Sequence, residues 1–270
     1  MEIFAVKKLN IKMKFKTSDN VELFYTDTQE DKPAILCLPG LGGSHVLWNL
    51  VIERMRNKYR VIVLDPRNQG LSQRTKKGER IARHAIDIYE FLQLMELDNI
   101  VGIGNSMGAS TLMAYLSIYH GKKFKAMIDL DQSPKMITDS SWPYGFKKLS
   151  WDNYPQYLEN ELGRATYIRV DRELARLAKK EYQKFPYIPA DNFQFFADHA
   201  LQDWRDVLAE CRIPFLILAG DHSPYFDYHF AEVVAKTNPL IKAEIIKDCG
   251  HIIQAEQPDK MVSAVENFVN

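Results

Sequence analysis

The chain has 270 residues, and its 35 Lys and Arg side chains balance its 35 Asp and Glu side chains, so the formal net charge is zero. This balance argues against a nucleic-acid partner and against a polybasic membrane-binding patch, because both leave a basic excess. No run approaches the roughly 18 apolar residues of a membrane span, and we expect no signal peptide at the N-terminus. The odd number and wide spacing of Cys37, Cys211 and Cys249 suggest neither disulfides nor zinc. We therefore expect a cytoplasmic globular protein of one large or two smaller domains.

Short apolar runs recur along the chain and indicate strands. Residues 9–16 and 21–26 predict an antiparallel pair joined by a polar turn at 18–20. Continuous apolar runs, which are typical of parallel strands buried on both faces, follow at 34–38, 60–64, 100–103, 126–130, 215–218 and 243–246. Helical spacing appears between the runs and is clearest from Ile81 to Met95. This alternation predicts an α/β fold with a mostly parallel sheet flanked by helices.

Residues 132–205 interrupt this alternation and predict short helices, one of them with Asp171 as its N-cap. These 74 residues hold 14 of the 31 aromatic side chains. We consider two interpretations equally: aromatic side chains that face a pocket, or aromatic side chains that fill the core of a small helical subdomain. The core domain is then predicted to consist of residues 1–131 and 206–270, with 132–205 as a helical insertion in the same folding unit.

A serine stands in a sharp turn after the run at 100–103. Gly104-Asn-Ser106-Met-Gly108 is a G-x-S-x-G pattern between a predicted strand and a predicted helix. The glycines are needed because a Cβ at either position would collide with the neighbouring strand or helix. The helix that begins behind Ser106 directs its first amides, that of Met107 foremost, at an oxyanion on the substrate. The pattern therefore predicts a nucleophilic serine.

The same residues also resemble a dinucleotide-binding fingerprint, since Gly102, Gly104 and Gly108 follow a strand and precede a helix. That fingerprint requires glycine or alanine at position 107, where the chain has Met107, and it usually opens a domain. We therefore expect no dinucleotide and no other cofactor.

A base and an acid follow in the order that a serine nucleophile needs. His251 lies between a predicted strand and the last predicted helix, and Asp221 lies in the loop after the strand run at 215–218. The order Ser106, Asp221, His251 is that of nucleophile, acid and base in one large group of enzymes. The glycine-rich turn at 39–44 follows another strand and lets backbone amides approach a ligand closely.

Taken together, these motifs resemble the α/β-hydrolase fold superfamily over nearly the whole chain. The matching residues are Pro39-Gly-Leu-Gly-Gly43, Asp65-Pro-Arg-Asn-Gln-Gly-Leu-Ser72, Gly104-Asn-Ser-Met-Gly108, Gly220-Asp221, Gly250-His251, Glu256 and Pro258. The resemblance implies an eight-stranded sheet and a lid inserted after the sixth strand. It also implies Ser106 as nucleophile, His251 as base and then acid, Asp221 as its orienting acid, and the amides of Leu41 and Met107 as the oxyanion hole. Two positions depart from the usual pattern: Pro39 stands where histidine is common, and Asn68-Gln69-Gly70 replaces a common G-H-G.

Several assignments remain open. Asp131, just past the run at 126–130, is the alternative orienting acid; otherwise it lines the pocket or caps the lid. Trp48, Trp142 and Trp151 are candidate pocket residues. Three histidines are expected on the surface or in packing positions: His84, His120 and His199. Asp221, His222 and His229 match no standard metal spacing, so we expect no metal site.

The sequence thus predicts a serine hydrolase that cleaves a small, mostly apolar carboxylic ester or related acyl compound through an acyl-enzyme. C–C bond hydrolysis, cofactor-free oxygenation and perhydrolysis use a similar set of residues on this fold and remain alternatives, as does a non-enzymatic ligand receptor. The expected partner is a small molecule, and both a monomer and a homodimer remain open.

Overall fold

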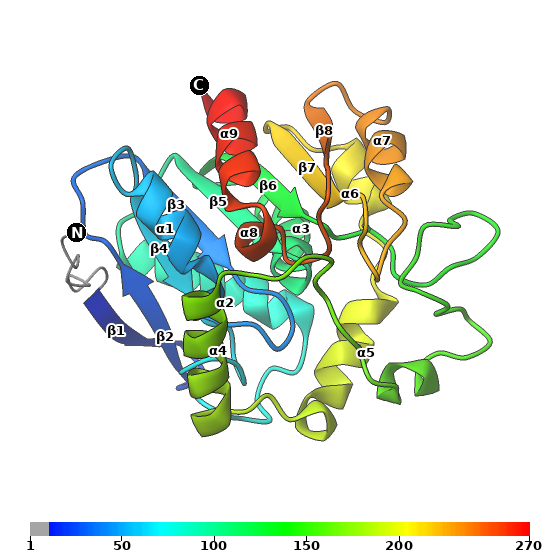
Figure 1. Ribbon diagram of the computed structural model, residues 1–270, viewed down its shortest axis with the longest axis horizontal. Helices are drawn as coiled ribbons and strands as arrows, with labels where there is room; N and C mark the ends of the chain where they lie inside the picture. Colours follow the sequence, from blue (N-terminus) through cyan, green and yellow to red (C-terminus); the bar gives the residue numbers. More distant parts are fainter. Residues whose placement is uncertain (1–10) are drawn as a thin grey trace.

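The computed structural model describes residues 11–270, which form an eight-stranded sheet (Figure 1). The strands are β1 (Ile11–Lys16), β2 (Glu22–Asp27), β3 (Ala34–Leu38), β4 (Arg60–Leu64), β5 (Ile100–Asn105), β6 (Phe124–Leu130), β7 (Phe215–Gly220) and β8 (Ile241–Ile246). Their order is β1-β2-β4-β3-β5-β6-β7-β8, with β2 antiparallel to both neighbours and all other pairs parallel. The predicted mostly parallel sheet with an initial antiparallel pair is confirmed; residues 9 and 10 of the first predicted strand lie outside the described residues.

The apolar runs form central strands because both faces of the sheet are covered. In β3, Ile35 and Cys37 belong to one buried cluster, whereas Leu36 and Leu38 belong to the other. Successive side chains of a strand point to opposite faces, so a strand between two apolar layers must be apolar at every position. This is why these strands lack the alternation of a half-exposed strand.

Helices cover both faces of the sheet. The helices are α1 (Asn49–Met55), α2 (Ile81–Leu94), α3 (Met107–Tyr119), α4 (Arg172–Lys184), α5 (Phe193–Leu201), α6 (Arg205–Ala209), α7 (His229–Ala235), α8 (Ile253–Glu256) and α9 (Pro258–Val269), with short 3-10 helices at His45–Trp48, Gln156–Glu159 and Pro189–Asn192. Side chains of α1 and α9 share one buried cluster, and those of α2, α3 and α7 share the other. In Figure 1, α1 and α9 lie in front of the sheet and α3 lies behind it.

The long segment between β6 and α6 contains α4, α5 and two 3-10 helices. It lies beside the sheet edge toward which the arrows of β3 and β6 point (Figure 1, green to yellow). Carboxyl ends of parallel strands are where open α/β sheets bind ligands, so this segment lies next to the expected site. Between residues 11 and 270 there is no helix of sufficient length and apolar character to span a bilayer.

Candidate active site

Ser106 occupies a strained turn between β5 and α3. Its backbone has φ 53° and ψ −123°, and its amide donates a hydrogen bond of 3.0 Å to the carbonyl of Leu130. A Cβ on Gly104 would lie 2.3 Å from the backbone nitrogen of Ala109, and a Cβ on Gly108 would lie 2.3 Å from the carbonyl oxygen of Leu38. The predicted steric need for both glycines is therefore confirmed. Strain of this kind persists only where the surroundings hold the residue in place, and it presents the Ser106 side chain at the sheet edge.

Replacing Gly104 with alanine is expected to lower the free energy of unfolding by about 3 kcal/mol or more, because the contacts to be relieved are with backbone atoms. Urea unfolding of the wild type and the variant measures this loss. Gly163→Ala is the matched control: Gly163 has φ +75°, but nothing lies within 4 Å of its added Cβ. This control is expected to lose only about 1 kcal/mol, for the left-handed backbone. Equal losses in both variants would contradict the steric argument.

His251 lies in the loop between β8 and α8, and Asp131 is its acidic partner. The Nδ1 atom of His251 lies 2.6 Å from Oδ2 of Asp131, and both side chains are buried. A carboxylate only accepts hydrogen bonds, so Nδ1 carries the proton and Nε2 has a free lone pair. Asp131 also accepts hydrogen bonds from the amide of Gly220 at 3.0 Å and the hydroxyl of Ser223 at 2.6 Å, which fix its orientation.

The prediction that Asp221 contacts the histidine is wrong. Its Oδ1 lies 2.8 Å from Nδ1 of His222 and accepts a 3.2 Å hydrogen bond from the amide of Cys249. Asp131 and Asp221 each directly follow one of two adjacent parallel strands, β6 and β7. The order of nucleophile, acid and base along the chain is therefore the same whichever of the two is the acid. The contacts of the two loops decide which carboxylate faces His251.

The loop that carries His251 is held by side chains on either side of it. Glu256 accepts hydrogen bonds from the amides of Gly250 and Ile252, and also from Tyr167 and Ile168 of the segment between β6 and α6. Asn105 donates from Nδ2 to the carbonyl of His251 at 2.9 Å. The histidine is thus tied both to the residue before Ser106 and to the segment between β6 and α6.

The glycine-rich turn after β3 lies directly against the serine. A Cβ on Gly40 would lie 3.0 Å from the Cβ of Ser106. The amide of Gly42 donates to Oε1 of Gln69, so the loop after β4 supports this turn. Leu41 lines the cavity beside Ser106, and Met107 is the first residue of α3, where helix amides have no intrahelical acceptor.

A cavity of about 250 Å³ opens beside Ser106 and His251. Its lining is mostly apolar and includes Leu41, Leu47, Met136, Phe146, Leu162, Ala165, Phe196, Tyr225, Phe226 and Ile252. The predicted pocket residues are not among its lining residues. Trp48 is fully buried in the cluster on the α1 and α9 face, Trp142 is buried and donates to the hydroxyl of Ser133, and Trp151 is 55% exposed. Asp131 lies behind His251 rather than on the cavity wall.

The aromatic side chains of residues 132–205 divide between the two interpretations. Phe146 and Phe196 line the cavity, Phe195 and Trp204 fill the core, and Tyr182 is exposed. Further lining residues were not predicted for the pocket, among them Gln132, His199, Tyr225 and Phe226. His199 is buried beside Phe195 and Phe196, as expected of a packing residue, and it also lines the cavity. The position of Gln132, two residues past a predicted strand end and next to Asp131, was the available signal for that residue.

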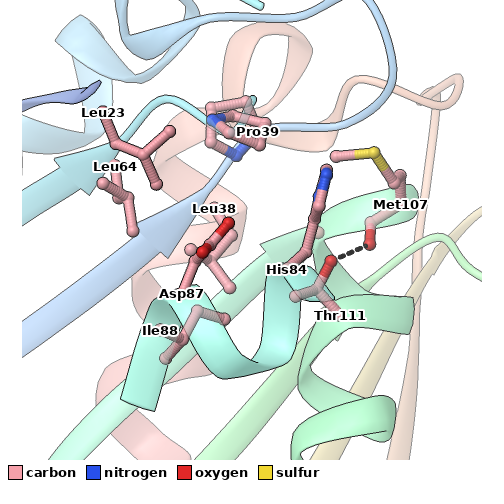
Figure 2. A pocket seen from close by; sticks show the side chains of 11 residues that line it. Leu23, Leu38, Pro39, Leu64, His84, Asp87, Ile88, Met107 and Thr111 are labelled. Carbon is pink, nitrogen blue, oxygen red and sulfur yellow. Dashed lines mark hydrogen bonds between the residues drawn. The ribbon is translucent and has the colours of Figure 1, made fainter. Parts of the chain in front are cut away.

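A second histidine, His84 of α2, lies in a small apolar space of about 20 Å³ beside the serine turn. Figure 2 shows its ring projecting from α2 toward the side of Met107, near Pro39. The ring stacks on Phe195 with centroids 4.3 Å apart, and its Nδ1 has no hydrogen-bond partner within residues 11–270. Burial lowers the pKa of His84 to about 3 and that of His199 to about 4. Both rings are therefore neutral at neutral pH.

This burial predicts an acid-sensitive fold. Below pH 6.5 the unfolded chain protonates both histidines, whereas the native state does not until their lowered pKa values are reached. Stability is thus fully present above pH 6.5 and falls as the pH is lowered, by about 1.4 kcal/mol per pH unit for each histidine. We expect the free energy of unfolding, measured with urea at pH 7, 6 and 5, to fall between pH 7 and pH 5 by about 2 kcal/mol less in His84→Phe than in the wild type.

His229→Gln is the control for this comparison, because His229 is exposed and pairs only with the neighbouring Asp227. Carboxylates that neither substitution contacts contribute equally to the wild type and both variants, so the difference between the pH profiles of His84→Phe and the wild type reports the buried histidine. An identical acid-induced loss in His84→Phe and the wild type would contradict a neutral, buried His84.

Comparisons with known proteins agree with this geometry. A family model described as the alpha/beta hydrolase fold matches residues 33–258. A 3-oxoadipate enol-lactonase of Acinetobacter baylyi is 26% identical over 89% of this chain and 90% of its own length. Esterase YbfF of Escherichia coli is 22% identical over 93% and 98% of the two chains. The solved structure of an esterase from Exiguobacterium antarcticum superposes with a TM-score of 0.84 at 19% identity, covering 96% of this chain and 99% of its own.

Proposed function

Because this chain belongs to the α/β-hydrolase fold family, we propose that it is a serine hydrolase that cleaves a small, mostly apolar carboxylic ester or related acyl compound. The observation that carries this proposal is the hydrogen bond between Asp131 and His251 beside the cavity that Ser106 lines. A buried carboxylate that holds Nδ1 of a histidine leaves Nε2 as a base, which is what a serine nucleophile requires. The esterases and the enol-lactonase among its relatives support ester chemistry.

In the proposed reaction, Nε2 of His251 accepts the proton of the Ser106 hydroxyl as its oxygen bonds to the ester carbonyl carbon. Asp131 stabilises the resulting imidazolium and holds its orientation. The amides of Leu41 and Met107 bind the oxyanion. The intermediate then collapses, His251 donates its proton to the departing alcohol, and an acyl-enzyme remains. A water molecule, deprotonated by His251, cleaves the acyl-enzyme in the same way and releases the acid and free Ser106.

The cavity supports an uncharged, mostly apolar substrate. Among the described residues, its lining contains no Lys, Arg, Asp or Glu, and it includes His251, the proposed base. Lys147 lies behind the wall, where its Nζ donates to the carbonyl of Leu162 and is 5.0 Å from the ring centroid of Tyr225. Residues 132–205 supply much of this wall, which supports their role as a lid over the substrate.

Covalent labelling tests the proposal on the unmodified protein. A fluorophosphonate is expected to label one residue per chain, and peptide mass spectrometry is expected to place the label on Ser106. Turnover of p-nitrophenyl acetate, butanoate and octanoate then measures the acyl length that the cavity accepts. Absence of both labelling and turnover would overturn the proposal and would favour a ligand receptor that retains the fold.

A further inference from the structure

His45 connects the glycine-rich turn after β3 to helix α4 and has no part in the proposed reaction. It follows the turn directly, as the first residue of the 3-10 helix His45–Trp48, and it is buried. Its Nδ1 lies 2.8 Å from Oδ2 of Asp65 in the loop after β4, and its Nε2 lies 3.3 Å from Oε2 of Glu181 in α4. The side chains of Asp65 and Glu181 are 0% and 13% exposed. Both nitrogens of one buried imidazole therefore face carboxylates.

This arrangement holds the ring of His45 in its charged form. A carboxylate accepts hydrogen bonds and cannot donate them, so each ring nitrogen must carry a proton to attract its partner, and the ring is then an imidazolium. Burial lowers the pKa of His45, but the charge and hydrogen bond of Asp65 and the charge of Glu181 outweigh burial and raise that pKa above its ordinary value.

Loss of one proton from His45 turns its contact with Glu181 from attraction into repulsion. Asp65 is fixed in place, because it also accepts from the amides of His45 at 2.6 Å and Leu71 at 3.0 Å. The remaining proton therefore stays on Nδ1 beside Asp65, and the lone pair of Nε2 faces Glu181. Because the pKa of His45 is raised, this pairing stabilises the folded state fully below the unfolded pKa of 6.5 and is lost as the pH rises through the folded-state pKa.

The other charged side chains around His45 have different positions or partners. The charge of Lys12 in β1 acts against protonation of His45. The charged side chains of α4 other than Glu181 are exposed. Four further elements lie against the 3-10 helix or the His45 ring, namely α1, β2, β4 and α8, and their charged side chains near it are exposed or bound elsewhere: Glu22, Asp27, Glu53, Arg54, Arg60 and Glu256.

Arg74 ties α4 to the same loop by a contact that does not titrate. Its guanidinium donates to the carbonyl of Phe185, at the end of α4, at 3.0 Å. Burial lowers the pKa of Arg74, and the charges of Asp65 and Glu181 act against this effect. An arginine in a protein keeps its proton. Deprotonation of His45 is therefore expected to loosen α4 without detaching it.

The turn that His45 follows carries Leu41, whose amide is a proposed oxyanion donor. On one side of Leu41, a Cβ on Gly40 would lie 3.0 Å from the Cβ of Ser106. On the other side, a Cβ on Gly42 would lie 3.6 Å from Cγ of Tyr187, in the loop after α4. The Leu41 amide thus lies between a contact with the proposed nucleophile and a contact with residues that follow α4. A shift of α4 that moves Tyr187 away removes a support of the turn beside Leu41.

We propose that protonated His45 is a positioning residue that holds α4 and Tyr187 against the glycine-rich turn through Glu181, so that the Leu41 amide is in place only while both ring nitrogens carry protons. This inference rests on the proposed ester hydrolysis and adds a regulation of the same site. Titration of His251 alone gives an activity that rises with pH and then stays level. Titration of His45 adds a fall on the alkaline side.

The pH profile of kcat/KM for p-nitrophenyl butanoate, with spontaneous hydrolysis subtracted, tests this role. In the wild type kcat/KM is expected to rise and then to fall about tenfold at alkaline pH. Glu181→Gln is expected to remove the fall, because an amide accepts from an imidazolium and donates to a neutral imidazole. Glu173→Gln is the matched control: it makes the same change at an exposed residue of α4 that pairs with Arg176, and it is expected to keep the wild-type profile.

Two measurements without substrate separate this inference from the proposed function. An NMR titration follows the ring of His45, identified by its absence from the spectrum of His45→Gln. The pKa is expected to lie above 6.5 in the wild type and to be lower in Glu181→Gln. Hydrogen exchange of the α4 amides, corrected for the intrinsic rate, is then measured on either side of this pKa. The protection factor is expected to be about tenfold lower on the alkaline side in the wild type and unchanged in Glu181→Gln.

A level wild-type profile at alkaline pH would overturn the positioning role, as would a fall that persists unchanged in Glu181→Gln. Equal protection of α4 on both sides of the His45 pKa would overturn it as well. If the protection changes as expected but Ser106 is not labelled and no ester is turned over, the proposed function fails, while the coupling of His45 to α4 stands.

Discussion

Replacing Asp131 with asparagine is expected to lower kcat for ester hydrolysis by about four orders of magnitude, because the amide no longer holds the tautomer of His251 that leaves Nε2 as the base. The same substitution at Asp221 is expected to leave kcat nearly unchanged, because Asp221 contacts His222 and the amide of Cys249 rather than His251. Steady-state turnover of p-nitrophenyl butanoate by both variants measures the difference.

The two substitutions form a matched pair. Asp131 and Asp221 each follow the last residue of a neighbouring strand, and asparagine keeps an oxygen that can accept from the amides that each carboxylate now binds. Urea unfolding of both variants checks that the fold is retained. A large loss of activity in Asp221→Asn with little loss in Asp131→Asn would reverse the assignment of the acid.

Replacing Ser106 with alanine is expected to lower kcat by about a millionfold and to abolish fluorophosphonate labelling, because Ser106 is the only serine, threonine or cysteine among the described residues that line the cavity. The variant also loses the polar atom that the strained turn presents, while the glycines that permit the turn remain. We therefore expect the folded state to be preserved. Active-site titration and single-turnover kinetics with p-nitrophenyl acetate measure the effect.

Ser110→Ala is the control for this substitution. Ser110 is buried in α3 one helical turn beyond Ser106, and its change removes a hydroxyl from the same helix without altering the cavity wall. Labelling and turnover in this variant are expected to match those of the wild type. If the fluorophosphonate labelled Ser106→Ala as fast as it labels the wild type, Ser106 would be excluded as the nucleophile.

The core strands could be predicted from the sequence because their signal is local. The runs at 34–38 and 60–64 coincide with β3 and β4, and β5, β6, β7 and β8 each extend by two residues beyond the predicted run. The added residues include glycine, asparagine and lysine, which interrupt an apolar run but can still continue a hydrogen-bonded ladder. Apolar composition therefore locates a buried strand, and its ends depend on pairing with the neighbours.

The cavity wall could not be predicted in the same way. Trp48, Trp142 and Trp151 were expected there, yet Trp48 packs in the buried cluster on the α1 and α9 face of the sheet and Trp151 faces solvent. The wall is built from Phe146, Phe196 and Tyr225, which are far apart in the sequence. Large apolar side chains serve cores and pockets equally well, so composition alone does not distinguish these uses.

The sequence by itself determined the family, the order of the motifs along the chain and the turn that carries Ser106, because each motif depends on spacing within a few residues. Only the tertiary structure decided between Asp131 and Asp221. Both carboxylates follow adjacent strands, and the direction of each depends on its own contacts: Gly220 and Ser223 hold Asp131 toward His251, whereas the amide of Cys249 holds Asp221 elsewhere. Those partners are 28 to 92 residues away along the chain. A contact over that separation exists only once the sheet has brought the strand ends together.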